Sequence, residues 1–304
     1  MSPAAEHANA RVTAIVVAHD SAHALPACLG AFAGQGVPVI VVDNASRDGS
    51  AELAERHGAR VLRMGYNEGY GRANNAGVRA ATTDFVLICN PDAVPDPGSV
   101  ERLLEAAARY PDAGLLAPRI IEPDGRFFFQ PRSLLAPYLT NPGGRLALPG
   151  GDCCAPFLSG ACFLTPRELF LDIGGFDPAI FLFYEDDDLC RRLADQRHAL
   201  VHVHEAVVRH ARGRSSAPEP GRIFRSRWHQ AWSRSYVSAK YGLPDPAPAM
   251  FTANAAKAAA AVLTLRRSLI ERYAGSAAGA LAFLCARTAL AREGIALQQS
   301  EAKR

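Results

Sequence analysis

Apolar residues in the first 120 positions follow two patterns that alternate along the chain. Short apolar runs, most of them rich in β-branched residues as in fully buried strands, lie at residues 12–18, 37–43, 59–64, 84–89 and 114–120. Segments with helical spacing of apolar residues separate them and lie at 25–36, 46–58, 70–78 and 99–109. Strands that alternate with helices predict parallel βαβ units, and therefore an open α/β sheet.

The pattern changes after residue 120. A hairpin is predicted around the Pro-Asp-Gly sequence at 123–125, and the proline- and glycine-rich residues 133–156 predict an irregular loop. Further strands are predicted at 157–166 and 198–210, and further helices at 222–241 and 250–297. The chain is thus expected to contain a disordered tail (1–10), a globular domain (11–245) and an Ala-rich helical extension (246–304).

Composition narrows the class of protein. The 304 residues, 49% of them apolar, can bury one large core or two modest ones. A net charge of +3 is too small to favour a nucleic-acid partner, but it suits an anionic substrate or an acidic membrane surface. The seven cysteines form no Cys-x-x-Cys pair, and neither a signal peptide nor a run of about 20 apolar residues is found, so we expect a cytoplasmic protein.

An unusual acidic run follows three aromatic residues in the sequence FLFYEDDDLCRRL, residues 181–193. One interpretation is a helix start, with Glu185 or Asp186 as the cap, because acids favour the N-terminal turn. The helix would run to about residue 195 and bury Leu189 and Leu193. The other interpretation is a general base, because a carboxylate beside an apolar wall can have its pKa raised.

Polar residues follow two of the predicted strands. Asp43 ends the second strand and Asp92 follows the strand at 84–89, so both should face one crevice at the carboxyl edge of the sheet. Asn-Pro-Asp at 90–92 is compatible with an ordinary turn or with a carboxylate that holds a divalent ion bound to a diphosphate. His210 precedes the basic sequence Arg212-Gly-Arg214, which suits phosphate oxygens.

Two other motifs are less specific. The sequence NEGYGRANNAGVRAA (67–81) matches neither a dinucleotide fingerprint nor a P-loop, and Asn67 and Asn75 within it can bind either backbone or ligand. His202 and His204 alternate on one strand face without a carboxylate or cysteine at ligand spacing, which favours a structural role.

Seven segments, taken in order, resemble glycosyltransferase family 2, especially its rhamnosyltransferase-like branch. They are VTAIVVAHD, VVDNASRDGS, NEGYGRANNAG, VLICNPDA, SGACFL, GGFDPAIFLFYEDDDLCRR and HARGRS, and the likeness covers residues 11 to about 242. The resemblance implies a GT-A fold, an open mixed sheet flanked by helices. It also implies a nucleotide-diphosphate sugar donor, Mg²⁺ or Mn²⁺ as cofactor, and inversion at the anomeric carbon.

The resemblance also implies roles for individual residues. Asp186 would be the catalytic base with Glu185 orienting the base or the acceptor. Asp43 would pair with the pyrimidine, Asp92 would hold the metal, and His210 would be a second contact to the metal or a contact to the diphosphate. The other donor-binding positions are His19, Asn67, Gly69, Asn75, Asn90, Arg212 and Arg214. Asn90 departs from the family's general Asp-x-Asp metal motif, although Asn-Pro-Asp is common in the rhamnosyltransferase-like branch. The aromatic residues before Glu185 would limit water, and Asp187 and Asp188 would cap the helix and face solvent.

The expected reaction is transfer of L-rhamnose from dTDP-rhamnose to a hydroxyl of a glycan or polyprenyl-linked acceptor in bacterial cell-surface polysaccharide synthesis. A UDP-hexose or galactofuranose transferase, and a regulatory protein that has lost catalysis but binds sugar nucleotides, are the alternatives. For the extension, two interpretations are open. Its helices pack on the catalytic domain, or they form a peripheral contact at the inner face of the cell membrane.

Overall fold

The computed structural model of the protein describes residues 11–136, 148–213, 215–216 and 219–293. The chain divides into two compact units, which are considered separately below. Of the described residues, the first unit contains most of those up to Phe176 and the segment after Asp186, and the second unit contains 68–71, 177–185 and the C-terminal region. The tail predicted at residues 1–10 lies outside the described residues.

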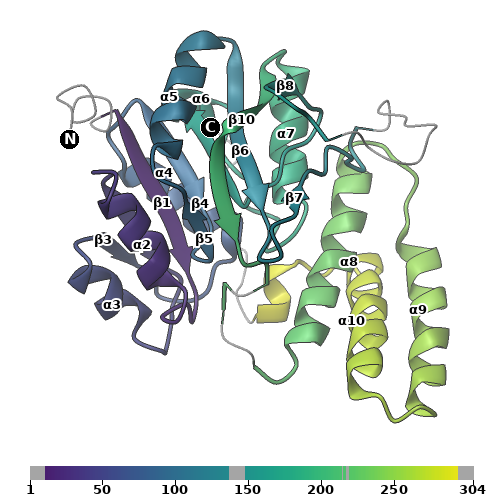
Figure 1. Cartoon of the computed structure of the whole chain (residues 1–304). Helices are drawn as coiled ribbons and strands as arrows, with labels where there is room; N and C mark the ends of the chain where they lie inside the picture. The colour runs from purple at the N-terminus through teal and green to yellow at the C-terminus, as the bar shows by residue number, and fades with distance from the viewer. Residues whose placement is uncertain (1–10, 137–147, 214, 217–218, 294–304) are drawn as a thin grey trace, which may run out of the picture. The chain divides into compact units, whose positions relative to one another are not determined.

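The first unit is built on one mixed sheet with the strand order β3-β2-β1-β4-β9-β6-β10-β5 (Figure 1). Its strands are β1 (Val12–Ala18), β2 (Val39–Asp43), β3 (Arg60–Arg63), β4 (Phe85–Cys89), β5 (Ala93–Pro95), β6 (Ala113–Ile121), β9 (Cys162–Pro166) and β10 (Ala199–His210). The short strands β7 (Phe127–Phe128) and β8 (Cys153–Cys154) pair with β6 and β10. The first four strands of this order are parallel, whereas β9 and β5 are antiparallel to their neighbours, which confirms the expected open mixed sheet.

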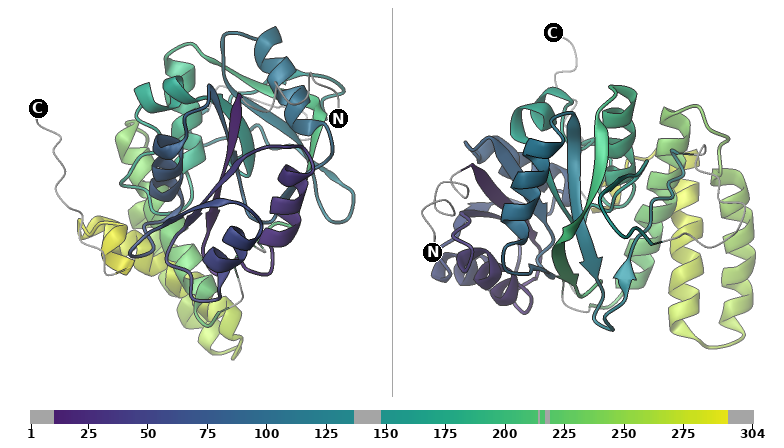
Figure 2. Two further views of the ribbon diagram at one scale, coloured as in Figure 1. Left: turned by 90° about the vertical axis from the view of Figure 1, so that its left-hand side faces the viewer. Right: turned by 45° about the horizontal axis from the view of Figure 1, so that its top comes forward.

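Helices cover this sheet on both faces, as the left view of Figure 2 shows for the N-terminal part. They are α2 (Leu25–Ala33), α3 (Ser50–Arg56), α5 (Ser99–Arg109) and α6 (Arg167–Asp172), together with α4 (Tyr70–Ala80) and α7 (Glu185–Asp195) after their first residues. The apolar pattern predicted these elements well, because β1 is buried along its whole length and α2 buries the four residues that define its spacing. The predicted hairpin at 123–125 is present as the turn between β6 and β7.

One sequence-based prediction fails in this unit. Residues 133–156 were expected to be irregular, but Cys153 and Cys154 form β8 and pair with Val201 and His202 of β10. A strand of two residues carries no periodicity, and only its partner strand defines it. Residues 137–147 of the same segment lie outside the described residues.

The order of the parallel strands places the future site. β1 lies between β2 and β4, and the register pairs Ala18 with Asp43 on one side and Val16 with Cys89 on the other. The loops that follow the three strands therefore leave the sheet at one edge, which is where open α/β sheets bind ligands.

The second unit consists mainly of three helices, α8 (Arg222–Lys240), α9 (Ala247–Val262) and α10 (Arg267–Leu284), and of a 3₁₀ turn at Leu290–Glu293. Helix α10 packs against both α8 and α9 (Figure 1). Its approach to α8 depends on two glycines four residues apart. A Cβ on Gly275 would lie 2.4 Å from the carbonyl oxygen of Phe224, and one on Gly279 would lie 2.2 Å from that of Trp228. Among the described residues, no helix has the length and hydropathy needed to cross a membrane.

Candidate active site

The loops after β1 and β2 are joined by a chain of polar contacts. Asp43, the last residue of β2, is buried, and its Oδ1 accepts a hydrogen bond of 3.3 Å from the Ser46 N–H. The Asn44 side chain donates to Oδ1 of Asn67 at 2.8 Å. The ring nitrogen Nδ1 of His19 lies 3.0 Å from the Asn44 carbonyl oxygen. Three of the expected donor-binding residues, Asp43, His19 and Asn67, are thus brought together at the carboxyl edge of the sheet.

A second cluster lies after β4, where a tight turn presents Asp92. The turn is closed by a 3.0 Å hydrogen bond from the Ala93 N–H to the Asn90 carbonyl, and Ala93 then pairs with His210 in the β5–β10 ladder. His210 Nε2 lies 3.3 Å from Asp92 Oδ1, and the two side chains are 11% and 1% exposed. The Ser215 hydroxyl donates to the same Asp92 oxygen at 2.6 Å. Residues that are more than 100 positions apart in the sequence therefore form one contact.

This cluster has the donor set of a divalent-cation site. His210 Nε2 is buried and makes no hydrogen bond within the described part of the chain. A carboxylate oxygen suits Mg²⁺ or Mn²⁺, and the imidazole nitrogen beside it offers a second ligand. Hard cations at phosphate sites take their remaining ligands from phosphate and water. No group of three or more histidine, cysteine or acidic side chains arranged to hold a metal occurs in the described residues, where this pair is the candidate. Asp92 and His210 fit a metal that is completed by a bound diphosphate.

Asn90 and Arg212 lie beside this cluster in the sequence. Asn90 is half-buried, and its N–H donates to the Ala161 carbonyl at 2.8 Å. Arg212 donates to Glu122 at 2.6 Å, and its guanidinium stacks 4.1 Å from the centre of the Phe128 ring. Hydrogen bonds from Arg212, then from Arg126, hold the pKa of Glu122 below its ordinary value. Arg212 is therefore paired with a carboxylate in this structure. Arg214 lies outside the described residues.

The acidic run starts α7, as the helix interpretation predicted. The helix spans Glu185–Asp195 and buries Leu189 and Leu193. The prediction that Asp187 and Asp188 face solvent is wrong for Asp188. Asp188 has a fully buried side chain that forms an ion pair of 2.8 Å with Arg192, one helical turn later.

Asp187 is half-buried, and it accepts a hydrogen bond from the Ser133 hydroxyl of the 133–156 segment. Solvation of a helix start was the reason for expecting both carboxylates outside. Here the helix is covered by the loop that holds Ser133, and Arg192 compensates the buried charge of Asp188. The sequence shows Arg192 one helical turn after Asp188 but not the burial of the pair, and it gives no sign of Ser133.

Asp186 is held by two main-chain amides. The Gly160 N–H donates to its Oδ2 at 2.9 Å, and the Asp187 N–H donates to its Oδ1 at 3.0 Å. The loss of water around the carboxylate raises the pKa of Asp186 above its ordinary value, and these hydrogen bonds oppose the rise. Loss of water and then the charge of Asp186 raise the pKa of Asp187 to about 7. The two carboxylates are therefore coupled, and they ionise in two steps that belong to the pair.

Glu185 and the aromatic residues before it belong to the second unit. Glu185 is buried, and the Phe181 ring stacks on His229 with a centroid separation of 4.4 Å. The Gly-rich segment needs a glycine at position 69. A Cβ there would lie 2.3 Å from the Phe181 carbonyl oxygen, and the backbone φ is +87°. The next residue, Tyr70, donates its N–H to that carbonyl at 3.0 Å. Gly69 thus serves the packing of this segment.

Asn75 was expected to bind either backbone or ligand, and the geometry favours the backbone. Its Nδ2 donates to the Phe176 carbonyl at 2.8 Å, and its Oδ1 accepts the Phe176 N–H at 2.9 Å. The side chain is buried and holds the turn at 174–176, where a Cβ on Gly175 would lie 2.5 Å from the same Oδ1.

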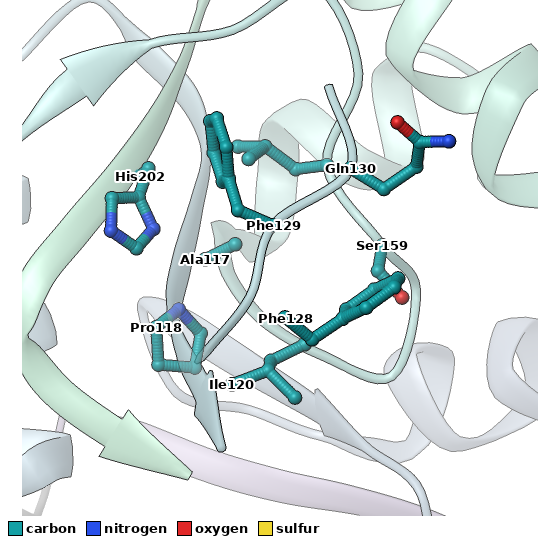
Figure 3. Close-up of a pocket in the computed structure, with 9 residues that line it drawn as sticks. Ala117, Pro118, Ile120, Phe128, Phe129, Gln130, Ser159 and His202 are labelled. Atoms are coloured by element: carbon teal, nitrogen blue, oxygen red, sulfur yellow. The ribbon is translucent and has the colours of Figure 1, made fainter. Parts of the chain in front are cut away.

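The surroundings of His202 and His204 agree with the structural role predicted for them. His202 stacks on Phe127 at a centroid distance of 5.4 Å, and burial, then the neighbouring His204, lower its pKa to about 4. The neutral ring of His202 forms one wall of a small cavity whose other walls include Phe128, Phe129, Gln130 and Ser159 (Figure 3). Ser159 directly precedes Gly160, so this cavity adjoins the loop that holds Asp186.

Four contacts at the site involve residues that sequence reasoning did not single out. Asn44 contacts Asn67, and Ser133 contacts Asp187. Gly160 contacts Asp186, and Ser215 contacts Asp92. Asn44 could have been found, because it follows Asp43 at the same strand end. The other three lie in irregular segments, and only the folded chain brings them to their partners.

Comparison with known proteins agrees with this architecture. The sequence profile of glycosyl transferase family 2 matches residues 13–174. An N-acetylglucosaminyl-diphospho-decaprenol L-rhamnosyltransferase of Mycobacterium tuberculosis is 30% identical over 242 residues, which cover 66% of this chain and 78% of that protein. A pre-mycofactocin glycosyltransferase of the same organism is 30% identical over 183 residues, 58% of this chain and 38% of that protein.

Solved structures share the fold at low sequence identity. A mannosyltransferase from Pyrobaculum calidifontis, in complex with GDP-Man and Mn²⁺, aligns over 90% of this chain and 87% of its own with a TM-score of 0.55 and 20% identity. Residues 1–349 of Staphylococcus aureus TarS align over 95% of this chain and 93% of their own, with a TM-score of 0.53 and 13% identity. The first unit has the GT-A fold, and the chain carries a C-terminal helical region.

Proposed function

The chain belongs to glycosyltransferase family 2, and from this premise we propose that it transfers L-rhamnose from dTDP-rhamnose to a sugar hydroxyl with inversion. The acceptor we propose is a glycan linked to a polyprenyl diphosphate, at the cytoplasmic face of a bacterial membrane, in the synthesis of a surface polysaccharide. The rhamnosyltransferase relative, whose name specifies such an acceptor, supports this choice.

One observation carries the proposal. The Asp186 carboxylate is fixed by two amide N–H groups, partly desolvated, and raised in pKa by that desolvation. In a direct displacement the acceptor hydroxyl loses its proton as its oxygen attacks the anomeric carbon. A carboxylate of raised pKa, held in place, is suited to take that proton, and such general-base catalysis contributes roughly 10²- to 10⁴-fold.

The other carboxylates have separate tasks in this scheme. Asp187 stays protonated up to about pH 7 and limits the charge next to the base. Asp188 forms an ion pair with Arg192 and stabilises the helix. Glu185, the first residue of α7, orients the acceptor or the base. A run of four acids thus supplies one base.

The donor would occupy the carboxyl edge of β1, β2 and β4. Asp43 would accept a hydrogen bond from the imide N–H that thymine and uracil share, so this contact serves either base. His19, Asn44 and Asn67 keep the loops around it in place. Asp92 and His210 would hold Mg²⁺ or Mn²⁺ next to the diphosphate. When bound, the cation offsets the negative charge that grows on the departing nucleoside diphosphate.

A ligand panel tests this proposal. Thermal unfolding of the full chain is followed with dTDP-rhamnose, dTDP-glucose, UDP-glucose, UDP-galactofuranose and GDP-mannose, each with Mn²⁺, Mg²⁺ or EDTA. The expected result is the largest rise in melting temperature with dTDP-rhamnose and metal, and loss of that rise in Asp43→Ala. A preference for a UDP-sugar would replace the rhamnose proposal by the hexose or galactofuranose alternative. Binding of donors without any slow donor hydrolysis or transfer would favour a regulatory protein.

A further inference from the structure

The connection between α9 and α10 exposes an unusual amount of aliphatic surface. Leu263 and Leu265 are each 87% exposed, the highest values among the large hydrophobic residues that the structure describes, and Val262 is 52% exposed. All three lie within four consecutive positions at one end of the α9–α10 helical hairpin (Figure 1). We call residues 262–267 the hairpin tip. Single exposed leucines need no explanation, but a cluster at a protruding turn does.

Three main-chain N–H groups of the hairpin tip are hydrogen-bonded within the turn. The N–H groups of residues 263, 264 and 265 donate to the carbonyls of residues 260, 261 and 262 at 3.0–3.2 Å. The Thr264 hydroxyl donates to the Ala261 carbonyl at 2.7 Å. Unpaired polar groups are the main cost of moving a chain segment into an apolar phase. At residues 263–265 the N–H groups and the Thr264 hydroxyl are already paired, which lowers that cost.

The charged residues between positions 246 and 270, a range that includes the hairpin tip, are all basic. Arg266 and Arg267 follow the leucines directly and are exposed, and the sequence contains no acidic residue between Asp245 and Glu271. Lys257 of α9 adds a third cation to this stretch. Arg267 pairs with Glu271 at 2.8 Å but keeps 78% of its side chain exposed, so its charge remains available at the surface. Aliphatic residues bordered by arginines match an apolar interior beneath an anionic headgroup layer.

A protein partner fits the hairpin tip less well. A stable protein–protein interface buries about 800 Å² on each side, whereas three aliphatic side chains at a turn offer only a fraction of that area. A bilayer needs no shape complementarity, and it accepts a small apolar insertion that is supported by basic residues. We propose that the hairpin tip is a membrane-contact site that inserts Val262, Leu263 and Leu265 into an anionic lipid surface. This inference does not depend on the donor or acceptor proposed above.

In this proposal the helices α9 and α10 do not themselves lie in the lipid surface. Helix α10 uses its small residues to pack against α8, so its inner face is not available to lipid. The proposed lipid contact is therefore confined to the turn. An 18-residue helix such as α10 is roughly 27 Å long, so the turn lies about that far from the other end of α10.

Co-sedimentation with vesicles tests the proposal on the full chain. Vesicles of phosphatidylcholine alone and of phosphatidylcholine with phosphatidylglycerol are compared for the wild type, for Leu263→Ser/Leu265→Ser and for Arg266→Gln/Arg267→Gln. The matched control is Leu281→Ser/Leu284→Ser, which removes two leucines exposed at 43% and 44% from the opposite end of α10. Circular dichroism and melting temperature of each variant verify the fold.

The wild type and the control should bind anionic vesicles, with weaker binding to neutral ones. The leucine variant should bind at least tenfold more weakly, and the arginine variant should lose the preference for anionic lipid. In Leu263→Trp, tryptophan emission should shift to shorter wavelength with anionic vesicles and be quenched by brominated lipid. Equal binding of wild type and leucine variant, loss of binding in the control variant instead, or no vesicle binding by the wild type would each overturn the proposal. Self-association of the wild type that the leucine variant abolishes, without vesicle binding, would assign the hairpin tip to a second copy of the chain.

Discussion

The main-chain N–H of Gly160 donates a hydrogen bond of 2.9 Å to Oδ2 of Asp186. The approach is close enough that a Cβ on Gly160 would lie 3.1 Å from the Asp186 Cβ and 3.3 Å from Oδ2. Gly160 lies in the loop before β9, whereas Asp186 lies in the first turn of α7. One amide therefore sets the position of the carboxylate relative to the sheet.

Gly160→Ala tests this positioning. The added methyl group must displace Asp186 by a few tenths of an ångström, and a displacement of about 1 Å at a catalytic group can reduce the rate roughly 100-fold. We expect kcat to fall about tenfold while the donor dissociation constant stays unchanged. Gly150→Ala is the control, because no atom lies within 4 Å of its added Cβ. A normal kcat in Gly160→Ala would show that this contact does not position the base.

Asp187→Asn separates the two neighbouring aspartates. Asparagine resembles protonated Asp187, so near pH 6 the variant should transfer sugar almost as well as the wild type. Its free energy of unfolding should depend less on pH. The raised pKa of Asp187 means that the folded wild type holds a proton that the unfolded chain releases near pH 4.

That contribution to stability is fully present below about pH 4 and is lost as pH rises toward about 7. The melting temperature of Asp187→Asn relative to the wild type should therefore increase between about pH 4 and about pH 8. Ser133→Ala, which keeps Asp187 but removes its hydroxyl partner, is the companion variant. A constant difference between Asp187→Asn and the wild type over this range would mean that Asp187 ionises as it does in an unfolded chain.

The Asp92–His210 pair predicts the metal dependence. Asp92→Ala should abolish stimulation by Mn²⁺, because it removes the carboxylate oxygen that hard cations prefer. His210→Ala should only increase the Mn²⁺ concentration required for half-maximal rate, because the Asp92 carboxylate remains. Ser215→Ala removes only a hydrogen bond to Asp92 and should have the smallest effect. Electron paramagnetic resonance of bound Mn²⁺ in the presence of donor provides a second measurement. Undiminished wild-type activity in excess EDTA would contradict a role for the metal.

The α8–α10 contact predicts a large effect from one methyl group. Gly279→Ala would place a Cβ 2.2 Å from the Trp228 carbonyl oxygen, so the helices must separate, at a cost of about 1–3 kcal/mol. Ser276→Ala on the same helix should be neutral or slightly stabilising, because alanine has the higher helix propensity. Both tryptophans of the chain, Trp228 and Trp232, lie in α8, so tryptophan fluorescence during unfolding reports this unit. Equal stability of the two variants would show that the glycine contact is not tight.

The fold was largely predictable because its elements follow from local periodicity. The runs that became β1 and β4, and the spacing that became α2 and α5, each match their element within three residues. Cys153–Cys154 was missed because a two-residue strand exists only through its pairing with β10. The grouping of α8 with α9 and α10 also depends on packing between Gly279 and Trp228, which no periodicity reveals.

The site could be predicted only where chemistry coincides with strand ends. Asp43, Asp92 and His210 are visible in the sequence because each is a polar residue at the end of an apolar run. The surroundings of Asp186 and Asp187 are set by Gly160 and Ser133, which lie 26 and 54 positions away in loops. Burial of Asp188 was missed for the same reason, because its ion pair with Arg192 is indistinguishable in sequence from an exposed helical pair.

The most direct test of the central claim is a transfer assay with wild type and Asp186→Asn side by side. Each protein is incubated with dTDP-rhamnose, Mn²⁺ and a short-chain N-acetylglucosaminyl-diphospho-prenol. The mass of the acceptor after the reaction is measured by mass spectrometry. We predict that the wild type adds one deoxyhexose with inverted anomeric configuration. Asp186→Asn should react roughly 10²- to 10⁴-fold more slowly although its affinity for the donor is unchanged. Transfer by Asp186→Asn at the wild-type rate, or no transfer by the wild type from any nucleotide sugar of the panel, would contradict this account.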